Sequence, residues 1–439
     1  MTRLLLALIL LLALPVAAHA RPGDPDRRFG RQGTVSLKAE AADAVGGAVK
    51  VISGNRVLAG GSAGGQFVVV RLRPSGSLDS RFGTGGQVVP ALPGTSLQGV
   101  RALAVFRDGR IVAAGTLTQA NGTTRMVAFR LLPTGEIDPG FGAGFGYVLA
   151  GPVNSVLGSM VMDRNGNVIL AGAYPTATNG EVPVVLRLLP DGSPDAGFAA
   201  NGTLDGATLN LTTGRATSLL VRPEGTITFT VGGAVDQGYV TNFTAVRLLP
   251  TGAPDPSFGG TGVVSIPLGT RAGLGVGAQA VRAGPSNTTL VAGTDLTDIG
   301  TPRGAVLRLR PDGTLDTRFG GRGITRISRA GDDLRITGMV RDSSGRILLS
   351  GSGRPPNSLV VRLRASGARD NRFGNGGLTF PLLGRPPGGN PIFTTFDAID
   401  RMGSRAVLAG SAAGPGLLRR TGAVTTYTGR FALTVSKLQ

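Results

Sequence analysis

Residues 71–83, RLRPSGSLDSRFG, decide the fold, because the same pattern returns along the whole chain. The pattern is Arg-Leu-x-Pro-x-Gly-x-x-Asp-x-x-Phe-Gly, and a shorter copy, GDPDRRFG, occupies residues 23–30. Further complete or slightly altered copies begin at Arg130, Arg187, Arg247, Arg308 and Arg362. The Phe of the pattern returns every 53 to 61 residues, at Phe29, Phe82, Phe141, Phe198, Phe258, Phe319 and Phe373. A fixed period of this length indicates a repeat architecture.

A second marker lies between successive copies. It is a β-rich run that ends in Ala-Gly or a close variant, at Gly60, Gly115, Gly172, Gly233, Gly293, Gly351 and Gly410. Each unit contains about four apolar runs of strand length, separated by Gly, Pro, Asn and Asp, and no stretch after residue 20 sustains helical periodicity. We therefore predict an all-β fold, a seven-bladed β-propeller of four-stranded antiparallel blades that forms a single domain over residues 21–439.

These two markers resemble the delta-60 repeat family, whose units have this length and carry D-x-x-F-G and D-G-x-I-x-V-A-G signatures. The resemblance covers residues 23–422. It implies an exported bacterial propeller and implies no particular reaction. Two departures are local: Ala199 replaces the Gly after Phe198, and the pattern degrades to TGAVTTYTG at residues 421–429.

The two ends of the chain bear on how the ring closes. The chain after the leader starts with half a repeat pattern and a strand at 33–37, and its last unit ends after a predicted third strand at 417–419. We predict that the N-terminal strand completes the last blade, which leaves no open sheet edge. Residues 431–438 are a competing candidate for that outer strand, and the sequence does not choose between them.

The first twenty residues have the form of a secretory signal. Arg3 is followed by an apolar run at 4–16 and by Ala18-His19-Ala20. We expect a secreted or periplasmic protein, with the cell surface as a further destination. After removal of the leader no transmembrane segment remains, and we expect a monomer.

The composition excludes several kinds of catalysis. The single histidine, His19, lies in the leader, and the chain has no Cys and no Trp. Ser-His-Asp and Cys-His catalysis and His- or thiolate-bound metals therefore lack their side chains. We predict no catalytic residue, no metal and no cofactor.

The net charge is +19, or +18 without Arg3, and a basic surface attracts polyanions. Only three lysines accompany the arginines, which are spread along the sequence and not gathered in runs. This spread favours a compositional bias over a dedicated binding site.

Connections of uneven length are the main functional indication. One set of variable connections lies at 90–98, 204–215, 266–277 and 381–392, and the other at 116–124, 173–181, 233–241 and 294–303. In an up-and-down blade both sets emerge on one face, and variable loops on a rigid scaffold are where binding is usually found. The candidate binding residues are Tyr174, Tyr239, Arg271, Asp295, Asp298, Arg303, Asp332 and Asp333.

The first functional hypothesis is a non-catalytic binding or scaffold module that recognises an unknown protein or glycan through this face. The second is a carboxylate-based glycan hydrolase or lyase, which needs two acids at one place. Its candidate acids are Asp205, Asp236, Asp295, Asp332 and Asp333. The third is a basic adhesin for anionic polymers, whose binding would weaken steeply with salt.

The residues of the repeat itself indicate architecture. An Arg stands eight residues before each repeat Asp, and we expect the Asp to cap its turn and to pair with that Arg. The Phe of each copy should fill the core between blades. The structural residues are Asp79, Asp138, Asp195, Asp255, Asp316 and Asp370, with Phe82, Phe141, Phe198, Phe258, Phe319 and Phe373.

Overall fold

The computed structural model describes most of the chain after the predicted leader. The described residues are 21–37, 44–95, 99–177, 180–232, 234–235, 238–239, 242–268, 277–297, 301–329, 333–353, 358–381, 393–413, 417–421, 424–428 and 431–439. Residues 1–20 lie outside them. Within these ranges the chain is all β apart from two short 3-10 turns, η1 (Ser53–Asn55) and η2 (Gly206–Leu209). None of the described helical segments is long and apolar enough to cross a membrane.

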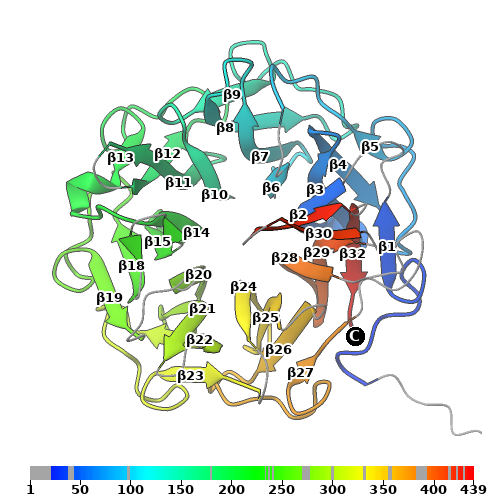
Figure 1. The fold of residues 1–439 in the computed structure, drawn as a ribbon. Coiled ribbons are helices and arrows are strands. Elements are labelled where there is room, and N and C mark those ends of the chain that lie inside the picture. The colour runs from blue at the N-terminus through cyan, green and yellow to red at the C-terminus, as the bar shows by residue number, and fades with distance from the viewer. Residues whose placement is uncertain are drawn as a thin grey trace, which may run out of the picture.

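Small antiparallel sheets stand around the centre of the molecule, with their strands stacked from the centre outward (Figure 1). The prediction of an all-β propeller is confirmed. The first sheet consists of β2 (Ala44–Ile52), β3 (Arg56–Ala63), β4 (Gln66–Leu72) and β5 (Gln87–Val88). The second consists of β6 (Val100–Val105), β7 (Ile111–Thr118), β8 (Thr124–Leu131) and β9 (Tyr147–Ala150). The third consists of β10 (Val156–Met162), β11 (Val168–Thr176), β12 (Gly180–Leu188) and β13 (Thr203–Asp205).

An eight-stranded sheet follows. Its first four strands are β14 (Arg215–Val221), β15 (Ile227–Gly232), β18 (Asn242–Leu248) and β19 (Val263–Pro267). Its other four are β20 (Gly277–Ala283), β21 (Thr289–Thr297), β22 (Thr301–Leu309) and β23 (Ile324–Ile327). One residue pair, Gly232 with Gly277, joins the two halves. The next sheet is β24 (Arg335–Arg341), β25 (Ile347–Ser352), β26 (Ser358–Leu363) and β27 (Leu378–Thr379).

The last sheet combines both ends of the chain. Its order from the centre outward is β28 (Phe393–Met402), β29 (Arg405–Ala413), β32 (Phe431–Lys437) and β1 (Thr34–Leu37). Thr34 pairs with Ser436 and Leu37 with Leu433, both in antiparallel register. Both candidates for the seam therefore take part, with β32 third in the sheet and β1 at its outer side (Figure 1).

The assignment of the third strand to residues 417–419 was wrong. β30 (Leu417–Thr421) pairs with β31 (Val424–Thr428) in a separate two-stranded sheet. The described residues of the degraded pattern, 421 and 424–428, thus belong to this separate pair of strands and not to a link between blades. The physical reason is that Lys437 of β32 stands where the other sheets have the repeat Arg and pairs with Asp26. Val435 of the same strand is buried in the core.

Each repeat pattern folds into a compact link between the third strand of its sheet and the outer strand. The Arg Nε donates to the Asp Oδ2 at 2.6 to 2.8 Å in all six complete copies. The Phe side chains of the links are at most 1% exposed, and each guanidinium lies over its Phe ring, as Arg71 does at 4.6 Å from the Phe82 centroid. In the last sheet Lys437 takes this place, with its Nζ 3.1 Å from Asp26 Oδ2 and 5.8 Å from the centre of the Phe29 ring.

The links also hold neighbouring sheets together. Arg71 and Arg247 donate through their terminal nitrogens to the carbonyls of Pro133 and Pro311, each at 2.6 Å, in the following link. A glycine in each link is needed for close approach. Gly76 has φ 87°, and a Cβ there would lie 2.6 Å from the backbone nitrogen of Gly30. The repeat pattern therefore encodes both the pairing within a sheet and the contact between sheets.

Candidate functional site

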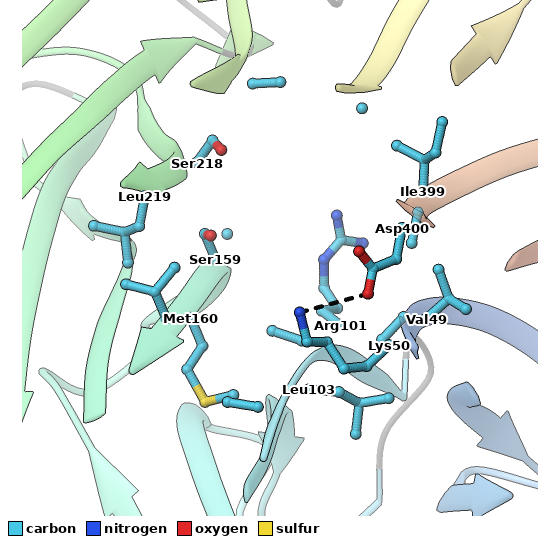
Figure 2. A pocket seen from close by; sticks show the side chains of 18 of the residues that line it. Val49, Lys50, Arg101, Leu103, Ser159, Met160, Ser218, Leu219, Ile399 and Asp400 are labelled. Atoms are coloured by element: carbon cyan, nitrogen blue, oxygen red, sulfur yellow. Dashed lines mark ion pairs between the residues drawn. The ribbon is translucent and has the colours of Figure 1, made fainter. Parts of the chain in front are cut away.

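A cavity of about 630 Å³ runs along the centre of the molecule. The strands that line it are the innermost strand of each group of four, namely β2, β6, β10, β14, β20, β24 and β28 (Figures 1 and 2). Most of the lining is aliphatic or small, as in Val49, Leu103, Met160 and Ile399. The few polar and charged groups therefore decide what the channel binds.

A β-bulge interrupts every one of these innermost strands at the same register. It places one extra residue against the second strand, at Gly47, Arg101, Gly158, Thr217, Gln279, Thr337 and Asp397. At one of these positions, Thr217 Oγ1 donates to the carbonyl of Ala278 on the next innermost strand at 2.8 Å. Bulges re-aim side chains and are frequent near functional sites. The same device here forms one ring of positions around the channel.

Three residues beyond the bulge a second layer carries charge. Lys50 on β2, Arg282 on β20 and Asp400 on β28 share this level, while the other innermost strands have Ala, Val or Leu there. Lys50 Nζ lies 3.4 Å from Asp400 Oδ2, and the same oxygen accepts the backbone N–H of Val51 at 2.8 Å. Asp400 is thus already engaged by two donors from β2.

The two arginines of the channel differ in setting. Arg101 is exposed and is the second residue of β6, directly after the connection at 89–99. In Figure 2 its side chain lies beside Lys50 and Asp400, across the cavity from Ser159 and Ser218. Arg282 donates to the carbonyl of Val281 at 2.7 Å, and desolvation lowers its pKa while Asp400 partly offsets that effect. An anionic group near Arg282 would relieve the cost of its desolvation.

The arrangement suits the binding of an anion better than acid–base catalysis. Among the described lining side chains, three are cationic and a single one, Asp400, is a carboxylate. General acid–base hydrolysis of glycosides needs two carboxyl groups a few ångströms apart. In the described part of the chain no group of three or more His, Cys, Asp or Glu side chains could hold a metal ion.

Of the predicted binding residues whose side chains the structure describes, none lines the channel. Tyr174 is half-buried near the end of β11, and its hydroxyl donates to Asp205 Oδ2 of β13 at 2.7 Å. This hydrogen bond, with burial and the charge of Asp205, raises the pKa of Tyr174 to about 12. Both residues belong to the same sheet, so Tyr174 stabilises its outer strand.

Asp295 and Arg303 lie in strands, although they were predicted for a variable connection at 294–303. β21 runs to Thr297 and β22 starts at Thr301, and in their register Asp295 is opposite Arg303. Asp295 is 2% exposed and accepts Arg326 Nε at 3.0 Å. The longer strands form because residues on both sides of the connection continue the antiparallel ladder.

The structure describes some of the other predicted binding residues. Asp333 is half-buried just before β24, and Tyr239 belongs to the short strand β17 (Gly238–Tyr239), paired with β16 (Ala234–Val235). Three more candidates and one acid of the hydrolase hypothesis lie outside the described residues: Arg271, Asp298, Asp332 and Asp236.

Lys50, Arg101, Arg282 and Asp400 were not predicted from the sequence. A signal exists for Lys50 and Arg101, because each stands in a run whose other residues are apolar or glycine, as in GVRALAVF at 99–106. Aligning the seven innermost strands by their bulges would have shown Lys, Arg and Asp where other repeats have Ala, Val or Leu.

Comparisons with known proteins agree with the fold. Five segments match the model described as "Domain of unknown function (DUF5122) beta-propeller", at residues 55–82, 107–141, 164–198, 223–258 and 284–319. None of the curated proteins compared with the chain matches it.

Several solved structures are similar over nearly the whole chain at low identity. Selenomethionine-substituted virginiamycin B lyase from Staphylococcus aureus has a TM-score of 0.49 and 12% identity, covering 92% of this chain and 98% of that one. Raptor from Chaetomium thermophilum has a TM-score of 0.47 and 9% identity, covering 91% of this chain and 28% of that one. Neither similarity bears on ligand or activity. The matched segments are those that carry the link pattern, so the chain is similar to a propeller repeat family at the residues that build its blades.

Proposed function

We propose that the chain is an exported binding propeller that recognises a protein or glycan through the face formed by its variable connections, with an anionic group of the ligand entering the central channel. The observation that carries this proposal is the charge of the channel, where Lys50, Arg101 and Arg282 accompany one engaged carboxylate, Asp400. Guanidinium and ammonium groups in a partly desolvated cavity form strong charge-assisted hydrogen bonds with carboxylate, sulfate or phosphate.

Arg101 connects the channel with the variable face. It follows directly on one of the variable connections, and its exposed side chain is accessible to a ligand that contacts those connections. Lys50, Arg282 and Asp400 lie further along their strands, toward the opposite end of the channel. A ligand on the variable face would therefore meet Arg101 first.

The architecture we propose for this module is a closed, seven-bladed ring that forms a single domain over residues 21–439 and acts as a monomer. The eight-stranded sheet then represents two blades, because each half has the strand order of a complete blade and a single residue pair joins them. The pairing of β1 with β32 supports closure by the N-terminal strand. The pattern of residues 1–20 supports export.

A glycan hydrolase or lyase is less well supported. Asp400 is the one described carboxylate of the channel and is paired with Lys50, while Asp205 lies on an outer strand and accepts the Tyr174 hydroxyl. Among the side chains that the structure describes, neither is paired with a second acid.

The test is to probe the full chain with arrays of acidic oligosaccharides and acidic peptides, and to measure affinities for the compounds retained. We expect Arg101→Ala to weaken binding by about tenfold or more, because a charge-assisted hydrogen bond contributes roughly 1.5 to 3 kcal/mol. The matched control is Arg107→Ala, an exposed arginine on the turn after β6 and outside the channel lining. Equal affinities of the parent and Arg101→Ala would refute the proposal. Release of reducing ends that disappears in Asp400→Asn would favour an enzyme instead.

A further inference from the structure

The residue two positions after the link Asp has the same backbone environment in all seven links. Its backbone N–H donates to the Asp Oδ1 at 2.9 to 3.3 Å. The residues at this position are Arg28, Arg81, Gly140, Gly197, Ser257, Arg318 and Arg372. Since Gly and Ser make the same hydrogen bond, the fold does not require arginine here.

The four arginines belong to links that are neighbours in space. Gly320 N donates to Ser366 O at 2.8 Å, Gly374 N to Pro22 O at 2.8 Å, and Gly30 N to Ser75 O at 2.6 Å. These bonds join the links of Arg318, Arg372, Arg28 and Arg81 in that order. All four side chains are exposed.

Other arginines of the same four links add to this charge. They are Arg21, Arg27, Arg31, Arg73, Arg310, Arg322, Arg364 and Arg369. We call these eight, with Arg28, Arg81, Arg318 and Arg372, the arginine arc. The remaining three links have no arginine besides the one that pairs with Asp, and they expose Glu136 and Asp191. The link arginines other than those that pair with Asp are therefore confined to one continuous sector, which also exposes Asp24 and Asp312.

A groove lies within the arc, between its first two links. Its volume is about 590 Å³, and its lining includes Arg318, Arg326 and Arg369 together with backbone at Gly320 and Gly367. Arg326 is paired with Asp295, and Arg369 donates to the carbonyl of Ser328. Arg318 is exposed and lines the groove, and among the described residues its one hydrogen bond is the link bond from its backbone N–H to Asp316. An acidic group of a ligand can enter here against arginine and glycine backbone.

We propose that the arginine arc binds a linear acidic polysaccharide that follows the arc from link to link. Arginine forms bidentate hydrogen bonds with carboxylate and sulfate, and evenly repeated links match a polymer with evenly repeated charges. This surface lies on the face of the links and turns, opposite the variable connections, so the inference is independent of the proposed function.

Two other polyanions fit less well. An anionic membrane laid against this face would also meet Glu136 and Asp191, which repel it. Duplex DNA is stiff and would have to bend along the arc, and single-stranded nucleic acid relies on aromatic stacking. Among the described residues the exposed large hydrophobic side chains are Val89, Phe145 and Val153, and none belongs to the four arginine links.

The experiment measures binding of the full chain to alginate and dextran sulfate, with a 20-base-pair duplex and phosphatidylglycerol vesicles as comparison ligands. In R28S/R81S/R318S/R372S every new Ser has a structural precedent in Ser257, and thermal denaturation verifies folding. We expect roughly tenfold to a hundredfold weaker polysaccharide binding, because exposed ion pairs each contribute little. The slope of log affinity against log salt should fall in magnitude by about 3, at roughly 0.7 for each lost charge.

Two gain-of-charge variants test the position of the charge. S257R extends the arc, because Gly259 N donates to Asp312 O and so joins this link to that of Arg318. G197R adds the same charge one link further away. We expect S257R to tighten binding more than G197R, and Arg101→Ala in the channel to leave it unchanged. The inference is overturned if the quadruple variant binds the polysaccharides like the parent, or if G197R tightens binding as much as S257R. It is also overturned if neither polysaccharide binds, or if the duplex or the vesicles bind more tightly than both polysaccharides.

Discussion

Asp26 offers a sharp test of how the two ends of the chain hold the molecule together. Its side chain is 2% exposed and contacts Lys437 Nζ at 3.1 Å and an Arg405 terminal nitrogen at 3.3 Å, while its Oδ1 accepts the backbone N–H of Arg28 at 3.2 Å. Burial by itself raises the pKa of Asp26, but the bonds from Lys437 and from the Arg28 N–H, and the charges of Lys437 and Arg405, hold it below its ordinary value. The carboxylate is therefore charged throughout the neutral range.

Replacing Asp26 by Asn removes the charge and keeps an acceptor for the Arg28 N–H. The Lys437 side chain is 8% exposed and would be left without its partner. Removing one member of a buried ion pair costs about 3 to 5 kcal/mol. Because Asn retains one hydrogen bond, we expect the lower end, about 3 kcal/mol in the free energy of unfolding.

The assay is urea unfolding followed by circular dichroism at pH 7. The control is Asp24→Asn, because Asp24 is exposed and, among the contacts described, its side chain accepts only the backbone N–H of Arg21, at 2.8 Å. We expect this variant to change the free energy of unfolding by no more than about 0.5 kcal/mol. The double variant D26N/K437M should recover part of the loss, because it removes the unpaired cation. A loss below about 1 kcal/mol in D26N would refute the view that this ion pair stabilises the seam.

Three further outcomes follow from the structure. Phe258→Ala should lower the free energy of unfolding by about 3 to 5 kcal/mol in urea titrations, because the ring is 0% exposed and lies under Arg247. A loss under about 1 kcal/mol would mean that the Phe258 ring is not part of the hydrophobic core. Burial raises the pKa values of Asp79, Asp138 and Asp316, but their Arg partners and backbone N–H bonds outweigh burial and lower the pKa values, so the stability that these carboxylates add is present above the ordinary value of 3.8 and is lost as the pH falls through the lower folded values. We expect melting temperatures that are constant from pH 7 to about pH 5 and fall below about pH 4; a decline at higher pH would contradict this. Replacing the β30–β31 hairpin, Leu417–Thr428, by a short Gly/Ser linker should leave the melting temperature almost unchanged, because in the described part of the chain these strands pair only with each other. Loss of folding would show instead that the hairpin belongs to the core.

The sequence by itself determined the features that depend on neighbours along the chain. Arg71 and Asp79 are eight residues apart and meet through one tight link, so their pairing follows from a pattern that repeats. The all-β class and the propeller architecture follow in the same way, because each unit repeats the same strand-length runs and turns. The bounds predicted for the variable connections were less accurate, as Asp295 and Arg303 show, because the strands extend where residues on both sides continue the ladder.

The tertiary structure alone decided what depends on residues far apart in sequence. Lys437 replaces the repeat Arg opposite Asp26, yet no local pattern marks it, because its partner lies at the other end of the chain. The same holds for Lys50 and Asp400 in the channel. Arg28, Arg81, Arg318 and Arg372 are far apart in the sequence and form one charged sector only because their links are hydrogen-bonded to one another. Local periodicity specifies each blade, whereas the charge of a surface or a channel is the sum over blades and exists only once they are assembled.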